Sequence, residues 1–131
     1  SRRIIFSTNL AETSVTVPRI KYVIDSGFVK LPMFDPKTKL DRLVVVPISH
    51  ASAQQRAGRA GRLQSGQCYR LYTEDFYRNE MQATTPPEII RTNLTHFILT
   101  LKALGVDNIL AFELMDHPGV DTLSHGLESL Y

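Results

Sequence analysis

The chain has 131 residues, 43% of them hydrophobic and 21% charged, and this length fits about one domain. One cysteine and four scattered histidines exclude an internal disulfide and give no metal-ligand spacing. The lack of an apolar run of about 18 residues predicts that no segment spans a membrane. The formal net charge is only +2, but residues 1–73 carry 12 Lys or Arg against 4 acids, while residues 74–131 carry 3 against 9. This asymmetry suggests that the first half faces a polyanion, with ordinary solvated surface charge as the alternative.

Two short buried strands are the first elements that the sequence predicts. Residues 2–8 and residues 21–25 are apolar runs of the kind found in parallel strands, and a polar segment links them. This arrangement suits one side of an α/β sheet. The chain begins inside the first run and ends within an amphipathic pattern, so we expect a segment of a longer protein.

A β-hairpin is predicted next, at about residues 28–46. Its strands would be Phe28–Phe34 and Leu40–Val46, and the DPKT sequence between them favours a type I turn. Its basic side chains are Lys30, Lys37, Lys39 and Arg42. The hairpin therefore adds to the positive charge of the first half.

A helix is predicted at residues 51–62, in a run rich in Ala, Gln and Arg. Each residue of a helix advances by about 100°, which places Gln55, Arg59 and Arg62 within an arc of about 60°. Arg56 would lie to one side of this arc. The pattern predicts a helix that presents two guanidinium groups and one amide in a single direction.

The glycines of this run are the unusual feature, because a glycine inside a helix costs about 1 kcal/mol relative to alanine. Gly58 and Gly61 are explained if a highly charged ligand must approach the helix closely. The start of the helix is a separate matter, and Ser49 or Ser52 is placed to cap it. Guanidinium groups bind phosphate oxygens bidentately. Arginine fingers use this chemistry at the γ-phosphate during nucleotide hydrolysis. A nucleic-acid backbone is the competing ligand, and a merely solvated helix leaves the glycines unexplained.

The remaining elements are a strand and a helical module. Residues 67–73 alternate as in a strand. A long helix is then predicted to start with Thr85 as its N-cap, with Glu88 completing a capping box, and to end at Gly105. A second amphipathic helix is predicted to begin near Val120.

Several stretches resemble, in the expected order, the motifs of the DEAH-box RNA helicases of superfamily two. Motif VI corresponds to QRAGRAGR and motif V to STNLAETSVT. Further similar stretches are YVIDSGFVK, SGQCYRLYTEDFY and PPEIIRTNL. Viral DExH helicases share the motif VI pattern, but the long hairpin and the helical module that follows favour the DEAH group. The resemblance covers essentially the whole chain.

This resemblance implies an α/β, RecA-like fold of the kind found in P-loop NTPases. Residues 1–80 would form the distal part of the second RecA-like domain, a parallel-sheet segment with the hairpin inserted. Residues 81–131 would begin a winged-helix domain. The implied activity is that of an ATP-dependent RNA helicase, which couples ATP hydrolysis to translocation along RNA and unwinding.

The resemblance also assigns roles on the nucleotide side. The residues implied to face the γ-phosphate are Gln55, Arg59 and Arg62, with the two arginines as fingers. Thr8 matches a position near the nucleotide, although a capping hydroxyl is the alternative for it. Many family members carry an acidic residue that contacts the nucleotide where this chain has Pro18, so the grip on the ribose or base is expected to be weaker here.

On the RNA side, Asn9 and Thr13 match motif V positions that contact the RNA backbone, with a purely structural role as the alternative. Lys37 and Lys39 of the hairpin are expected to contact RNA and to help separate strands. No metal site is expected in this chain. ATP would bind with Mg²⁺ held by the first RecA-like domain, which would also supply the P-loop and the DEAH box.

These expectations extend to partners. The expected partners are RNA, the first RecA-like domain and the C-terminal domains of the parent chain. A protein activator is a further partner that the resemblance allows. The single cysteine fits a reducing compartment, in the nucleus or the cytoplasm. This segment contains no GxxxxGK[ST] pattern, so alone it should not hydrolyse ATP.

Two other functions stay open from the sequence. The parent chain would be a catalytically dead scaffold that binds RNA or protein if its P-loop or DEAH box were lost. A winged-helix DNA binder without nucleotide chemistry is the weaker alternative, because the acidic second half would repel phosphates.

Overall fold

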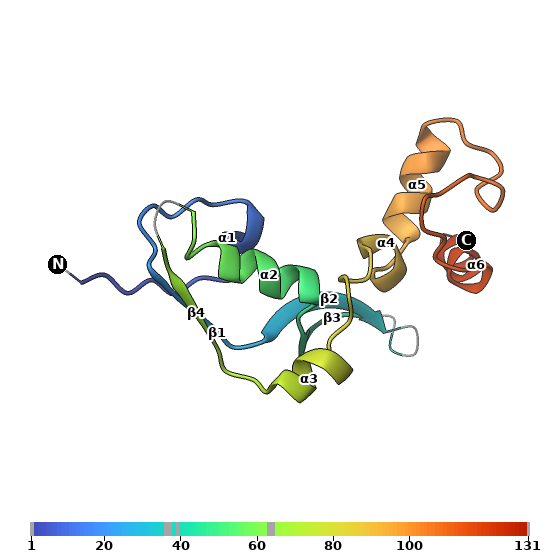
Figure 1. Ribbon diagram of the computed structural model, residues 1–131. Helices are drawn as coiled ribbons and strands as arrows, with labels where there is room; N and C mark the ends of the chain where they lie inside the picture. The colour runs from blue at the N-terminus through green and yellow to red at the C-terminus, as the bar shows by residue number, and fades with distance from the viewer. Residues whose placement is uncertain (1, 36–37, 39, 63–64, 131) are drawn as a thin grey trace. The chain divides into compact units, whose positions relative to one another are not determined.

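The computed structural model describes residues 2–35, 38, 40–62 and 65–130 (Figure 1). The chain divides into two compact units, and each is considered by itself. The first unit is Ser1–Lys30 with Val45–Thr85, and the second is Leu31–Val44 with Pro86–Tyr131. The expected domain limit between residues 80 and 81 stays a prediction, because a compact unit need not coincide with a domain.

The first unit is built on two parallel strands, β1 (Tyr22–Asp25) and β4 (Gln67–Arg70). Their register runs from Tyr22 opposite Gln67 to Asp25 opposite Arg70. The helix α2 (His50–Gly58) packs against both strands and against the short helix α1 (Leu10–Thr13) (Figure 1). Parallel strands need a crossover, and α2 lies within that crossover. The predicted α/β class with a parallel sheet is therefore confirmed.

The core of the first unit is small and lies beneath α2. Its buried residues are Ile48, Ala53 and Met81, joined by the partly buried side chains of Val29, Tyr72, Phe76 and Tyr77. Phe76 and Tyr77 come from α3 (Glu74–Asn79), which begins where the Thr73 hydroxyl accepts a hydrogen bond from the Phe76 backbone N–H at 3.1 Å. The segment after β4 thereby closes the core.

The predicted hairpin is confirmed. Its strands are β2 (Phe28–Asp35) and β3 (Leu40–Pro47), which pair with each other in a two-stranded sheet (Figure 1). Lys37 and Lys39, which were expected to contact RNA, lie outside the described residues. Their role stays a prediction.

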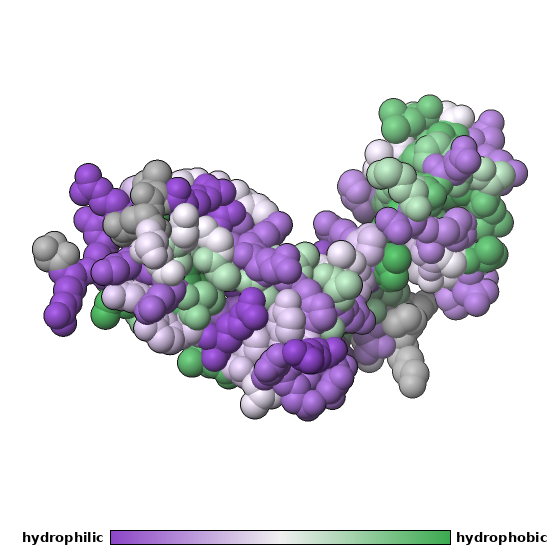
Figure 2. Space-filling view, viewed as in Figure 1, coloured by the Kyte–Doolittle hydropathy of each residue, from purple (hydrophilic) through white to green (hydrophobic). Residues whose placement is uncertain are grey.

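Within the described residues of the second unit, the helices are α4 (Glu88–Arg91), α5 (Thr95–Ala103) and α6 (Val120–Glu128). Its core consists of the buried side chains of Leu94, Ile98, Leu101, Ile109 and Leu123. The predicted helix near Val120 is confirmed. Figure 2 shows hydrophobic surface over α5, and the large exposed hydrophobic residues between positions 95 and 112 are Leu99, Leu104, Leu110 and Phe112. None of the helices in the described ranges is long and apolar enough to cross a lipid bilayer.

The predicted first strand is wrong. Residues 2–8 have no regular secondary structure, and Ile4 and Phe6 are 85% and 96% exposed. An apolar run forms a strand only where a neighbouring strand takes up its backbone hydrogen bonds. Among the described residues, β1 and β4 pair with each other and no strand pairs with this run.

The predicted helix at residues 51–62 begins one residue earlier and ends four residues earlier. Ser49 is its N-cap, because the Ser49 hydroxyl accepts the Ser52 backbone N–H at 3.1 Å. The helix ends at Gly58, and Arg59 donates its backbone N–H to Arg56 at 3.1 Å, one residue closer than in an α-helix. Glycine disfavours helix continuation, and this tighter last turn leads out of the helix. Arg62 therefore lies beyond α2.

The long helix predicted from Thr85 to Gly105 is also wrong in two places. Pro87 occupies the N-cap of α4 without a side-chain hydrogen bond, and the Thr85 hydroxyl instead donates to the Ser49 hydroxyl at 3.3 Å. The helix then breaks before α5, where the Asn93 side chain accepts the Thr95 backbone N–H at 2.9 Å. Asn competes with the backbone in this way, and so it starts a new helix.

The chain closes tightly where it enters β4, and this closure supports a first prediction. A Cβ added at Gly66 would lie 2.0 Å from the Ala60 carbonyl oxygen and 2.7 Å from the Lys21 carbonyl oxygen. Because both neighbours are backbone atoms, Gly66→Ala is expected to lower the free energy of unfolding by about 1 to 3 kcal/mol. Denaturant unfolding checks this value. Gly61→Ala is the matched control, since a Cβ there meets no atom within 4 Å, and equal stability of the two variants would contradict the prediction.

Candidate functional site

The candidate site begins at the end of α2, where two arginine side chains turn toward one segment. Arg59 donates from Nη2 to the Glu12 carbonyl oxygen, and Arg62 donates from Nη1 to the Thr16 hydroxyl at 3.0 Å. Glu12 lies in α1 and Thr16 follows it closely. The two arginines thus converge on residues 12–16, although only Arg59 adjoins the helix that was expected to carry both.

One guanidinium nitrogen of this site has no partner. Nη1 of Arg59 is buried and lacks a hydrogen bond among the residues that the structure describes. A buried donor without an acceptor costs free energy, of the order of 1 to 3 kcal/mol, which an added acceptor would recover. Arg59 therefore has spare capacity for an anionic ligand.

Gln55 lies on the exposed surface of α2, and the structure does not bring it to either arginine by a direct contact. Its side chain makes no hydrogen bond within the described part of the chain. A Cβ at Gly58 or Gly61 would meet no heavy atom within 4 Å. Packing within the described chain therefore does not require these glycines, which leaves helix termination and ligand access as their roles.

The predicted residues of motif V are all exposed. The Thr8 hydroxyl accepts the Leu10 backbone N–H at 3.4 Å, and Asn9 stands at the N-cap of α1 without a side-chain hydrogen bond. The Thr13 hydroxyl lies 3.4 Å from the Ser14 hydroxyl. The weak bond of Thr8 agrees with the capping alternative, and the exposure of all three side chains leaves them open to a ligand.

A buried ionic network centred on Arg56 was not predicted from the sequence. Nε of Arg56 donates to Oε1 of Glu12 at 2.7 Å, and its Nη1 donates to Oδ1 of Asp25 at 2.8 Å. The Asp25 side chain is fully buried. Its Oδ1 also accepts the Gly27 backbone N–H, and its Oδ2 accepts the Tyr72 hydroxyl, both at 3.0 Å. The contacts that Arg56 and Tyr72 make with Glu12 and Asp25 join residues 31 to 47 positions apart, so no local pattern points to them.

The pKa values of two members of this network, Tyr72 and Arg56, are raised. Burial and the hydrogen bond to Asp25 raise the pKa of Tyr72, so its hydroxyl remains a donor at neutral pH. Burial opposes the charge on Arg56, but its bonds to Asp25 and Glu12 prevail and raise its pKa. Burial, with the Asp25 charge, also raises the pKa of Cys68. The thiol is therefore protonated and poorly nucleophilic.

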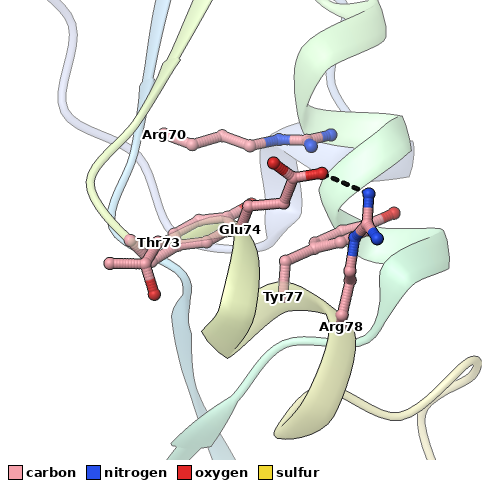
Figure 3. Close-up of a pocket in the computed structure, with 6 residues that line it drawn as sticks. Arg70, Thr73, Glu74, Tyr77 and Arg78 are labelled. Atoms are coloured by element: carbon pink, nitrogen blue, oxygen red, sulfur yellow. Dashed lines mark hydrogen bonds and ion pairs between the residues drawn. The ribbon is translucent and has the colours of Figure 1, made fainter.

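A surface pocket of about 400 Å³ lies beyond the end of β4, and it contains none of the predicted site residues. Its lining residues are Arg70, Tyr72, Thr73, Glu74, Tyr77 and Arg78. Figure 3 shows the Arg70 guanidinium over the Tyr77 ring, at 4.8 Å from the ring centre, and the ion pair of Glu74 with Arg78. Both arginines of the pocket therefore already have partners, Arg70 the Tyr77 ring and Arg78 the Glu74 carboxylate.

No group of three His, Cys, Asp or Glu side chains within the described residues is arranged to hold a metal ion. The described residues therefore form no cluster of carboxylates that would hold Mg²⁺ by itself.

The fold agrees with one class of protein, the C-terminal domain of helicases. Residues 1–64 match the family described as the helicase conserved C-terminal domain. The solved structure of the DEAH/RHA helicase HrpB from Escherichia coli superposes on 95% of this chain and 16% of its own, with a TM-score of 0.88 and 35% identity. A second structure, described as the DExH-box NTPase HrpB of E. coli, covers 94% of this chain and 15% of its own at a TM-score of 0.86 and 35% identity. The RecA-like α/β fold is therefore confirmed.

Two curated relatives indicate which kind of helicase the chain resembles. The chain is 54% identical over 130 residues to the pre-mRNA-splicing factor ATP-dependent RNA helicase prp22 of Schizosaccharomyces pombe, covering 99% of this chain. It is 53% identical over 130 residues, again 99% of the chain, to the probable ATP-dependent RNA helicase DHX35 of Homo sapiens. The predicted resemblance to the DEAH-box RNA helicases is therefore confirmed over nearly the whole chain. The chain spans 11% and 18% of the lengths of these two relatives.

Proposed function

We propose that this chain supplies the second-lobe side of the ATP site in an ATP-dependent RNA helicase. Arg59 and Arg62 act as arginine fingers on the γ-phosphate, and the Gln55 amide faces the same phosphate. The observation that carries the proposal is the convergence of Arg59 and Arg62 on residues 12–16, beside the exposed polar groups of motif V. ATP is the substrate, and a first RecA-like domain provides the P-loop and the Mg²⁺ site.

The mechanism follows from charge placement. Negative charge builds on the transferred phosphoryl group, and donors fixed in advance stabilise it without reorganising in the transition state. Arg59 already has one unpaired buried nitrogen, so it gains an acceptor when a phosphate arrives. Its other nitrogen bonds the Glu12 carbonyl oxygen. When Arg59 binds the phosphate, its hydrogen bond to the Glu12 carbonyl oxygen of motif V is therefore either replaced or kept beside the new one.

RNA binding belongs to the same proposal. Asn9 and Thr13 contact the RNA backbone from motif V, and their exposed side chains are available for this role. Because residues 12–16 accept hydrogen bonds from both arginines, a shift of the arginines toward the nucleotide moves the RNA-contacting segment. The hairpin, with Lys37 and Lys39, guides or separates strands, and residues 81–131 begin a winged-helix domain.

ATP hydrolysis by the longer polypeptide that contains this chain tests the proposed function. Hydrolysis that a single-stranded oligoribonucleotide stimulates is the expected result. Protein that binds RNA without turning over ATP would instead be the catalytically dead scaffold. This isolated segment should show no turnover, since it contains no P-loop sequence.

A second prediction concerns the outer arginine. Arg62→Ala is expected to lower ATP turnover by about a hundredfold, since one preorganised donor to the developing charge is lost. The change should leave the thermal midpoint unaltered, because Arg62 is exposed and makes a single hydrogen bond. Steady-state kinetics with saturating RNA measures the effect. Arg78→Ala, which removes an exposed arginine of the same unit, is the control, and equal activities of the two variants would count against the finger role.

A further inference from the structure

The network around Arg56 links three segments that are distant in the chain. Arg56 bonds the Glu12 carboxylate of α1 at 2.7 Å and the Asp25 carboxylate of β1 at 2.8 Å. Both of its terminal nitrogens also donate to the Phe28 carbonyl oxygen at 3.2 Å. The guanidinium therefore clamps α1, the end of β1 and the start of β2 to α2.

Asp25 and Glu12 differ in the hydrogen-bond partners that their side chains have besides Arg56. Asp25 is fully buried and keeps donors from Gly27 and Tyr72 as well as from Arg56. Among the described residues, the Glu12 side chain, 12% exposed, has Arg56 as its only hydrogen-bond and ionic partner. Loss of the Glu12 side chain thus removes one tie between α1 and α2 while the Asp25–Arg56 pair remains, so the buried Asp25 keeps its ionic partner.

Glu12 stands between the two halves of the proposed site. Its carbonyl oxygen accepts a hydrogen bond from Arg59, and the next residue is Thr13, the proposed RNA contact. Thr16, four residues after Glu12, accepts a hydrogen bond from Arg62. A change in the position of Glu12 therefore moves Thr13, on the RNA side, and the groups that accept hydrogen bonds from Arg59 and Arg62, on the nucleotide side.

We propose that Glu12 and Arg56 are positioning residues, and that their ion pair holds α1 so that RNA contact at Thr13 is transmitted to Arg59. Neither residue touches nucleotide or RNA. The pair fixes the Glu12 carbonyl oxygen that Arg59 binds, and it fixes the orientation of the Thr13 hydroxyl relative to α2. This inference rests on the proposed function.

The test uses the longer helicase polypeptide, ATP and a single-stranded oligoribonucleotide. In Glu12→Ala, the RNA concentration that gives half-maximal stimulation of ATP hydrolysis is expected to rise about tenfold, a size typical of a lost coupling contact. The KM for ATP is expected to change by less than about twofold, because no nucleotide contact is removed. Glu12→Gln keeps an oxygen that accepts the Arg56 Nε–H, and it should restore most of the RNA response.

The control is Glu74→Ala, which breaks an exposed Arg–Glu pair in the same unit and should leave both constants unchanged. An unchanged RNA response in Glu12→Ala would overturn the inference. So would a Glu12→Gln variant as defective as Glu12→Ala with a lowered thermal midpoint, since that pattern describes a merely structural ion pair. Wild-type protein without RNA-stimulated hydrolysis would overturn the proposed function itself, which distinguishes the two failures.

Discussion

Arg59→Ala in the longer helicase polypeptide is expected to reduce ATP turnover by about a thousandfold while RNA binding persists. An arginine finger contributes at least this factor in nucleotide hydrolases, because it neutralises charge that develops only in the transition state. Arg59 is suited to the role because one of its terminal nitrogens is buried without a partner among the described residues. Steady-state ATP hydrolysis, with RNA affinity measured in parallel, checks the expectation.

Two further variants sharpen this prediction. Arg59→Lys keeps the positive charge but loses the planar fork, so most of the turnover should still be lost. Arg78→Ala removes an arginine that pairs with Glu74 on the surface and should behave as wild type. Near wild-type turnover in Arg59→Ala would contradict the finger assignment. A parallel loss of RNA binding would indicate that Arg59 holds motif V and not the phosphate.

Asp25→Ala is expected to lower the free energy of unfolding by about 3 to 5 kcal/mol, the cost of leaving one partner of a buried ion pair uncompensated. The Asp25 side chain is fully buried, and Arg56, 15% exposed, would keep only Glu12 as its ionic partner. The Tyr72 hydroxyl would lose its acceptor as well. Denaturant unfolding of the variant and the wild type gives the difference directly.

The comparison variants separate charge from hydrogen bonding at this position. Tyr72→Phe removes one neutral donor to the same carboxylate and should cost about 1 kcal/mol. Glu74→Gln weakens an exposed pair and should change stability by less than about 1 kcal/mol. A loss in Asp25→Ala no larger than in Tyr72→Phe would mean that the buried pair is not a main support of the first unit.

Elements with strong local signals were predicted well from the sequence. The hairpin follows from two apolar runs around a turn sequence, and β1 and β4 follow from apolar or alternating runs. Ser49 and Ser52 were both predicted as possible caps because they precede or begin a run of good helix formers. The bond from the Ser52 backbone N–H to the Ser49 hydroxyl shows that Ser49 is the cap. In these cases the deciding interactions lie within a few residues of the chain.

The failures share a different physical origin. Residues 2–8 are apolar enough for a buried strand, but a strand depends on a paired neighbour that local sequence does not reveal. The break before α5 depends on a single side chain, Asn93, which competes with the backbone for an N–H group. In α2 the glycines were assigned to ligand access alone, whereas Gly58 also marks the end of the helix.

The candidate site was predicted in part. The motif resemblance selected Arg59 and Arg62, and the structure brings both to residues 12–16. Arg56 was set aside because it lies off the expected helical face, yet it carries the densest set of polar contacts near the site. Its partners Glu12 and Asp25 are 44 and 31 residues away in the chain, so only the fold reveals the network.

The finger assignment is tested most sharply by a structure of the longer helicase bound to RNA and to a transition-state analogue of ATP hydrolysis. We expect the guanidinium groups of Arg59 and Arg62 and the amide of Gln55 to lie within hydrogen-bond distance of the γ-phosphate mimic. A structure in which both arginines still bond only Glu12 and Thr16, with other residues around the phosphate, would contradict the assignment.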